Sequence, residues 1–171
     1  QILVQAGTAW AIKLKDDDTT TDNYGYVTFT LSGSGGYKEI SSSGTLPIYD
    51  GDFYSVMLTR KSSSEELLSS DDEAQRIKYE LLVKKYDNTR HKIHLANSSS
   101  FTTILSGESD DQRTYNSTFT GSNTVYIGGH SSGTGSALFN ASRFTGSMME
   151  FRYWNTPLNT SSFDNHCLLY T

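Results

Sequence analysis

Residues 77–83 read Ile-Lys-Tyr-Glu-Leu-Leu-Val, and this stretch decides the fold class of the 171-residue chain. Every second residue from Ile77 to Val83 is apolar, which is the period of a β-strand with one buried face. A second alternating row follows at His91, Ile93 and Leu95. Residues 86–89, Tyr-Asp-Asn-Thr, lie between the rows and carry the Asp–Asn pair expected in a hairpin turn. The stretch therefore predicts an antiparallel β-hairpin.

Alternating segments of the same kind recur along the chain, separated by turn-rich stretches. The apolar faces of these segments are Trp10, Ile12 and Leu14; Val27, Phe29 and Leu31; Tyr54, Val56 and Leu58; and Val125 with Ile127. A last long strand is expected over residues 147–154. Roughly ten short strands and almost no helical pattern predict an all-β fold, an antiparallel two-sheet jelly-roll β-sandwich.

The same rows predict the core and the domain organisation. Seven residues are expected to be substantially buried: Trp10, Phe29, Tyr54, Leu81, Ile93, Ile127 and Phe151. Residues 64–74 are rich in Ser and Asp and are interpreted mainly as a long inserted loop, although residues 65–68 could form a helical turn. Residues 161–166 are expected to form a short helix. No repeat or linker is visible, so residues 1–171 are interpreted as one domain.

Composition excludes several classes of protein. Hydrophobic residues make up 35% and charged residues 19% of the chain, which is too apolar for a disordered protein. The net charge of −5 argues against nucleic-acid binding, which needs a clustered basic surface. The nearest basic group, Lys84-Lys85 with Arg90 and Lys92, is interpreted as the solvent face of a hairpin. The single cysteine, Cys167, allows no internal disulfide.

Two further expectations concern the context of the chain. No apolar run approaches the roughly 20 residues of a membrane span, so no membrane insertion is expected. No signal peptide is visible, and the chain begins at Gln1 rather than Met. We therefore expect it to be a piece of a longer polypeptide.

The stretch Phe-Thr-Gly-Ser-Met-Met-Glu-Phe-Arg-Tyr-Trp-Asn-Thr-Pro-Leu, residues 144–158, resembles the closing strand of laminin-G-like and pentraxin-like domains. Residues 124–129, Thr-Val-Tyr-Ile-Gly-Gly, resemble a strand of that family that ends in a Gly pair. Residues 48–60 resemble its segment with an aromatic pair before a strand and an Arg at the strand's end. The ordered set implies a member of the concanavalin A-like lectin/glucanase superfamily. Met149 stands where an acid is common, which weakens any metal role for this strand.

A narrower similarity concerns Ser147-Met148 through Trp154, followed by Phe-Asp-Asn-His at residues 163–166. This arrangement is similar to jelly-roll domains in structural proteins of tailed phages and other viruses. The resemblance implies a module displayed on a capsid, tail or fibre, or on a cell surface, with other structural proteins or cell-surface glycans as partners. Its expected localisation is the virion or the extracellular surface.

The acidic residues do not predict an enzyme. Retaining glycosidases need two carboxylates about 5 Å apart, and the glucanase run Glu-x-Asp-x-x-Glu is missing from this chain. Glu150 and Arg152 share one face of the expected strand and are interpreted as a structural pair. Adjacent His166 and Cys167 point apart, so they do not form a nucleophile–base pair. No catalytic residue and no cofactor are therefore expected.

Rim loops remain the candidate binding sites. Tyr115, Asn116 and His130 lie in such loops and could contact a ligand. Residues 16–24 are rich in oxygen ligands of the kind that calcium prefers, with Asp16, Asp18, Asp22 and Asn23 as candidate ligands. The stretch lacks a recognised ligand spacing, so no metal site is assigned. A carbohydrate-binding lectin module of a larger adhesin or secreted glycan-active enzyme, with or without calcium, stays open as the alternative function.

Overall fold

Two antiparallel sheets dominate the structure, a computed structural model that describes residues 1–17, 23–33, 36–62, 76–87, 92–104, 124–129 and 142–168. In these ranges the elements are β1 (Ile2–Ala6), β2 (Trp10–Asp16), β3 (Gly25–Gly33), β4 (Gly36–Ser41), β5 (Tyr54–Ser62), β6 (Arg76–Asp87), β7 (Lys92–Ile104), β8 (Val125–Ile127) and α1 (Thr160–Leu168). All named strand pairs are antiparallel. The predicted all-β class is confirmed, with one short helix.

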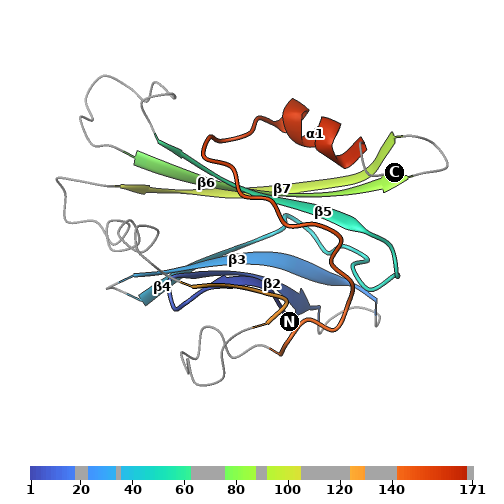
Figure 1. The fold of residues 1–171 in the computed structure, drawn as a ribbon, viewed down its shortest axis with the longest axis horizontal. Coiled ribbons are helices and arrows are strands. Elements are labelled where there is room, and N and C mark those ends of the chain that lie inside the picture. Colours follow the sequence, from blue (N-terminus) through green and yellow to red (C-terminus); the bar gives the residue numbers. More distant parts are fainter. Residues whose placement is uncertain are drawn as a thin grey trace.

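The strands form two layers, which Figure 1 shows nearly edge-on. One sheet has the order β4-β3-β2-β1-β8, and the other has the order β5-β6-β7. The helix α1 lies against the outer side of the three-stranded sheet, where Phe163 packs with Met57 and Leu82. The predicted short helix near residues 161–166 is thus confirmed and extends slightly further at both ends.

The core lies between the two layers because each contributes the apolar face of its strands. One buried cluster combines Val27, Phe29, Leu31 and Ile40 of the first sheet with Tyr79, Leu81 and Val83 of the second, together with Leu46. The rings of Phe29 and Tyr79 lie 5.5 Å apart across the interface. The predicted burial of Phe29 and Leu81 is confirmed, while Trp10 and Tyr54 pack partly buried against the same cluster and Ile93 is half-buried.

The antiparallel pairing predicted for the rows at residues 77–83 and 91–95 is also confirmed, but Tyr86 and Asp87, which were expected in the turn, belong to β6. β6 and β7 pair antiparallel, with Tyr86 opposite Ile93 and Asp87 opposite Lys92. The ladder runs from these pairs to Arg76 opposite Ile104, so the hairpin is the longest in the described part of the chain. The inserted segment expected at residues 64–74 lies outside the described residues.

Three expectations about the C-terminal half are wrong. Residues 147–154 form no strand, because none of the ladders among the described residues includes them. Phe151 is consequently 41% exposed. Ile127 is 52% exposed because β8 is a three-residue strand at the edge of its sheet, where β1 is its one neighbour among the described strands. The alternating pattern identified an apolar face in both segments. It could not show whether another part of the protein buries that face.

The beginning of the chain meets two late segments. β1 pairs with β8, and the amide of Gly128 donates to the carbonyl of Leu3 at 2.7 Å. The amide of Ile2 donates to the carbonyl of Ser142 at 2.9 Å. From there the chain passes across to the outer side of the other sheet and enters α1, as Figure 1 shows in orange and red. This path brings residues 147–157 to the surface.

We expect Gly25→Ala to lower the free energy of unfolding by about 1–3 kcal/mol, the usual cost of overpacking. Gly25 exchanges two backbone hydrogen bonds with Leu46, and a Cβ placed on it would lie 2.5 Å from the carbonyl oxygen of Lys15. That oxygen belongs to the backbone of β2 and cannot move aside cheaply. Gly129→Ala is the matched control, because among the described residues its Cβ would meet the flexible Arg143 side chain at an ordinary contact distance of 3.5 Å. Equal urea midpoints for the two variants would contradict this account.

Candidate functional site

The predicted rim residues are distributed between described and undescribed parts of the chain. Asp16 is the exposed last residue of β2, and Asn23 begins the return into β3, with the amide of Asp17 donating to the carbonyl of Tyr24 at 3.2 Å. Asp18, Asp22, Tyr115, Asn116 and His130 lie outside the described residues. In the ranges that the structure describes, no three His, Cys, Asp or Glu residues cluster as metal ligands. The calcium and glycan sites therefore stay predictions.

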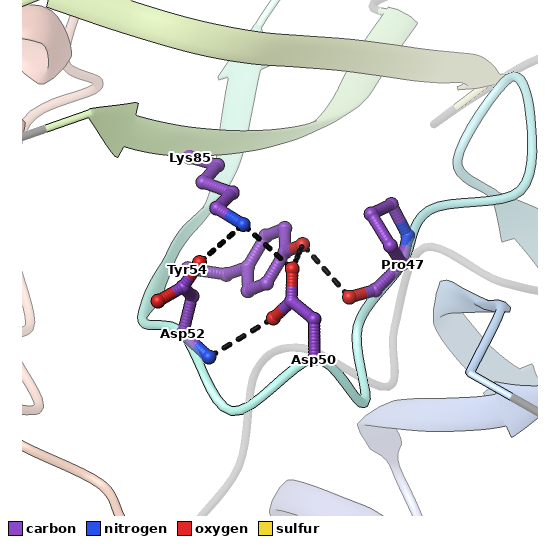
Figure 2. A network of polar contacts seen from close by, with 5 residues as sticks. All are labelled: Pro47, Asp50, Asp52, Tyr54 and Lys85. Carbon is purple, nitrogen blue, oxygen red and sulfur yellow. Dashed lines mark hydrogen bonds and ion pairs between the residues drawn. The ribbon is translucent and has the colours of Figure 1, made fainter. Parts of the chain in front are cut away.

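A polar network joins the loop before β5 to the antiparallel pair β5–β6 (Figure 2). The Nζ of Lys85 donates to Oδ2 of Asp50 at 2.6 Å and lies 2.5 Å from Oδ2 of Asp52. The hydroxyl of Tyr54 lies 2.9 Å from the carbonyl oxygen of Pro47 and 3.0 Å from Oδ2 of Asp50. We call Asp50, Asp52, Tyr54 and Lys85 the latch, because together they hold the loop against the strands.

Local sequence explains the geometry of the latch. Tyr54 and Lys85 are direct partners in the β5–β6 ladder, so both side chains stand on the same face, and the Lys85 ammonium lies 5.5 Å from the centre of the Tyr54 ring. Gly51 has a φ of +84°, a conformation that side chains with a Cβ disfavour. This residue reverses the chain so that the Asp52 amide donates to Oδ1 of Asp50 at 2.9 Å.

The electrostatics of the latch favour a structural role. Burial alone would raise the pKa of Asp50, but hydrogen bonds from Lys85, the Asp52 amide and Tyr54 outweigh it and hold that pKa below its ordinary value. Hydrogen bonds to Asp50 and Asp52 raise the pKa of Lys85, and burial followed by the bond to Asp50 raises the pKa of Tyr54. Each of the three pKa values is shifted away from neutral pH, whereas acid–base catalysis works best with a pKa close to the working pH. Asp50, Tyr54 and Lys85 therefore keep their ordinary charge states at physiological pH.

We expect the latch to stabilise the fold by about 1 kcal/mol in a defined pH window, since its members are partly solvated. Asp50 has a lowered pKa, so its contribution is present above the unfolded value of about 3.9 and is lost as the pH falls through the folded value. Lys85 has a raised pKa, so its contribution is present below about 10.4 and is lost as the pH rises through the folded value.

The variant Lys85→Met tests this window by urea unfolding between pH 2 and pH 7. Its free energy of unfolding should fall less steeply than that of the wild type below about pH 4, because Asp50 no longer has a cationic partner. Lys61→Met is the control, because its ion pair with Glu80 is longer, at 3.4 Å. Parallel acid profiles for the wild type and Lys85→Met would show that the latch carries no such stability.

Lys84 and Lys85 do not belong to the solvent face that the sequence predicted for the basic residues of the hairpin. Lys84 is only 7% exposed and forms an ion pair with Asp164 of α1, while its ammonium lies 5.6 Å from the centre of the Phe163 ring. Lys85 points to the other face of the sheet, where Asp50 and Asp52 of the latch hold its ammonium. Arg90 lies outside the described residues. Each adjacent lysine is thus neutralised by a carboxylate from a distant segment.

The segment between Ser142 and α1 carries a strip of exposed apolar side chains. We call residues 148–154 the aromatic strip, and its exposed members are Met148, Met149, Phe151, Tyr153 and Trp154. Tyr153 is 78% exposed. Single exposed hydrophobic residues are common on protein surfaces, but here five large apolar side chains lie within seven consecutive residues. Contiguous apolar patches of this kind mark interaction sites.

The strip also contains two charged residues, Glu150 and Arg152, whose contacts hold it in position. The Nε of Arg152 donates to Oε1 of Glu150 at 2.6 Å, which confirms the predicted structural pair. A guanidinium nitrogen of Arg152 lies 2.9 Å from Nδ1 of His166, and the rings of Trp154 and His166 lie 5.0 Å apart. These contacts tie the strip to α1. They also place Glu150 beside a cation.

Sequence reasoning missed the aromatic strip as a surface and the latch as a network. The strip had a visible signal, namely five large apolar residues in seven positions, but the signal equally suits a buried strand. For the latch, the visible signal in the sequence was the turn Asp-Gly-Asp at residues 50–52. Among the described residues, no helix is long and apolar enough to cross a membrane.

No family model, no curated protein and no solved structure matches this chain.

Proposed function

We propose that this chain is a non-catalytic structural module that works by protein–protein contact within a larger assembly, such as a capsid, tail or fibre, or on a cell surface. The exposed aromatic strip is the observation that carries the proposal. Aromatic residues, Met and Arg are enriched in protein interfaces, and all of them occur within residues 148–154. Contact with a partner would remove this apolar surface from water, which is the main driving force of association.

We also propose that the fold is a jelly roll of the concanavalin A/laminin-G-like type. The ordered motifs at residues 48–60, 124–129 and 144–158 support this assignment. The meeting of the start of the chain with residues 124–129 and 142–145 supports it as well, because it returns the late segments to the first strand. Two facing antiparallel sheets are compatible with this type of sandwich.

A rigid scaffold suits a display role. The latch fixes the loop before β5, and the contact of Lys84 with Asp164 fixes α1 at the other side of the same sheet. The aromatic strip leads directly into α1, and Arg152 and Trp154 contact His166 of that helix. The strip is thereby presented in a defined position, which lowers the entropy lost on binding.

A photo-crosslinking amino acid at position 153 tests the proposed contact. It is introduced into the chain as produced in its native host, and we expect covalent adducts with protein partners. The matched control is position 53, because Phe53 is also an exposed aromatic residue, at 56%, but lies outside the strip. Adducts of equal yield at both positions, or none at position 153, would overturn the proposal.

A carbohydrate-binding lectin module is the second candidate function. The exposed rings of Tyr153 and Trp154, flanked by hydrogen-bonding groups of Arg152 and Asn155, favour it as a surface for sugar rings. Glycan-array binding that depends on Trp154, together with no protein adducts from position 153, would favour this candidate. Repeating the array with a calcium chelator would show whether the candidate ligands at residues 16–23 contribute.

A further inference from the structure

We propose that two copies of this chain associate through the aromatic strip, which pairs with the same segment of a second copy as antiparallel strands centred on Phe151. This inference rests on the proposed function and names the partner in the proposed contact. It follows from three properties of residues 147–154: their backbone, their alternation and the register of their charges.

The first property is a backbone that joins neither of the two sheets formed by the described residues. None of the ladders among the described residues includes residues 147–154, and the segment forms no helix and no turn. Its sequence nevertheless has the alternation and the β-favouring aromatic content of a strand. A segment of this kind gains its ladder when another strand lies beside it.

The second property is the division of the segment into two faces. In a strand, Met149, Phe151 and Tyr153 would share one face, which is entirely apolar. The other face would carry Met148, Glu150, Arg152 and Trp154, with the two charges in the middle. The segment contains one acid and one base, so it has no net charge, whereas the whole chain carries −5. Two copies can therefore approach at this segment without concentrating charge of one sign.

The third property is the register. Antiparallel pairing centred on Phe151 places Glu150 opposite Arg152 of the partner subunit, and by symmetry Arg152 opposite Glu150 of the partner subunit. The same register places Met149 opposite Tyr153 of the partner subunit, and Met148 opposite Trp154 of the partner subunit. Opposite charges and aromatic pairs in direct cross-strand positions are the pairs that stabilise sheets.

Neighbouring registers lack this match. Centring the pair on Glu150 places two glutamates opposite each other, and centring it on Arg152 does the same for two arginines. Centring between residues places a charged side chain opposite an aromatic one. The segment is thus complementary to itself in one register, as a two-fold symmetric interface requires. This self-complementarity selects a second copy of the chain over an unrelated partner.

Charge exchange tests the pairing, with the full chain studied by sedimentation velocity over a range of concentrations. We expect a reversible dimer for the wild type. Glu150→Arg places arginines opposite each other at two symmetry-related positions, and Arg152→Glu does the same with glutamates. Each variant should weaken the dimer at least tenfold. Lys15→Glu, an exposed change of the same charge difference as Arg152→Glu, should leave the dimer unchanged.

The decisive measurement is an equimolar mixture of the two variants. In a mixed dimer each arginine again faces a glutamate, so association should return, and it should also return in the double variant E150R/R152E. Recovery in the mixture shows that both variants are folded, even though each loses the contact between Glu150 and Arg152 within one chain. Circular dichroism of each variant alone provides the same check.

The outcomes separate this inference from the proposed function. A wild-type monomer whose position 153 crosslinks to a different protein overturns the self-pairing and leaves the proposed function standing. A dimer that survives in both single variants, or is not restored in the mixture, also overturns the self-pairing. A monomer without any adduct overturns both proposals.

Discussion

Phe29→Ala is expected to lower the free energy of unfolding by about 3–5 kcal/mol, the usual cost of removing a buried aromatic side chain. Phe29 is fully buried in β3, an inner strand of its five-stranded sheet, and its ring lies 5.5 Å from that of Tyr79 in the opposite sheet. The substitution removes apolar area and leaves a cavity between the two layers. It therefore weakens the contact that holds the sheets together.

Urea unfolding followed by circular dichroism measures this effect through the midpoint and the slope of the transition. Phe53→Ala is the matched control, because Phe53 is 56% exposed and its loss should change the stability by no more than about 0.5 kcal/mol. A loss below about 1 kcal/mol for Phe29→Ala would contradict a shared core between the sheets, since surface substitutions commonly stay in that range.

Asp164→Ala is expected to lower the free energy of unfolding by about 2 kcal/mol. The substitution leaves the ammonium of Lys84 buried without its carboxylate partner, and breaking a fully buried pair costs about 3–5 kcal/mol. The expected value is lower because the Asp164 side chain is one-third exposed and water can partly replace it. Because Asp164 lies on α1, the same substitution should loosen the helix from the sheet, which hydrogen exchange of residues 160–168 would report.

A double-mutant cycle separates the lost pair from lost packing. Lys84→Met removes the charge and keeps an apolar side chain beside Phe163, so the double variant K84M/D164A should recover to within about 1 kcal/mol of the wild type. Glu80→Ala is the control for an ordinary surface pair, since Lys61 and Glu80 are both about one-quarter exposed and should contribute less than 1 kcal/mol. Additive losses at Lys84 and Asp164 would exclude a coupled pair.

The sequence by itself determined several of the strands and the apolar face of each, although β1 and β4 were not predicted and residues 147–154 form no strand. Phe29 and Leu81 were correctly placed in the core because alternation with a period of two is a local property of the chain. The hairpin of β6 and β7 followed from two alternating rows and a short turn, which needs no distant partner. The pair of Glu150 and Arg152 was predictable for the same reason, since two residues spaced by one share a side of an extended segment.

The candidate site depended on contacts that no local pattern contains. Lys84 and Lys85 are neighbours in the sequence, yet alternation sends them to opposite faces, where each meets a carboxylate of a distant segment. Asp164 is 80 residues from Lys84, and Asp50 is 35 residues from Lys85. Their spacing therefore suggested a solvated basic face, and only the packing of α1 and of the loop before β5 neutralised both lysines.

Tertiary structure alone decided the exposure of the aromatic strip. The alternation in residues 147–154 predicts a strand, but a strand is buried only where a neighbour supplies hydrogen bonds and a covering face. In the described part of the chain, all ladders form without this segment, so Phe151 and Tyr153 face water. The apolar pattern is a property of one segment, whereas strand pairing depends on two segments. The sequence therefore determined which residues make up the strip but not which segment pairs with it.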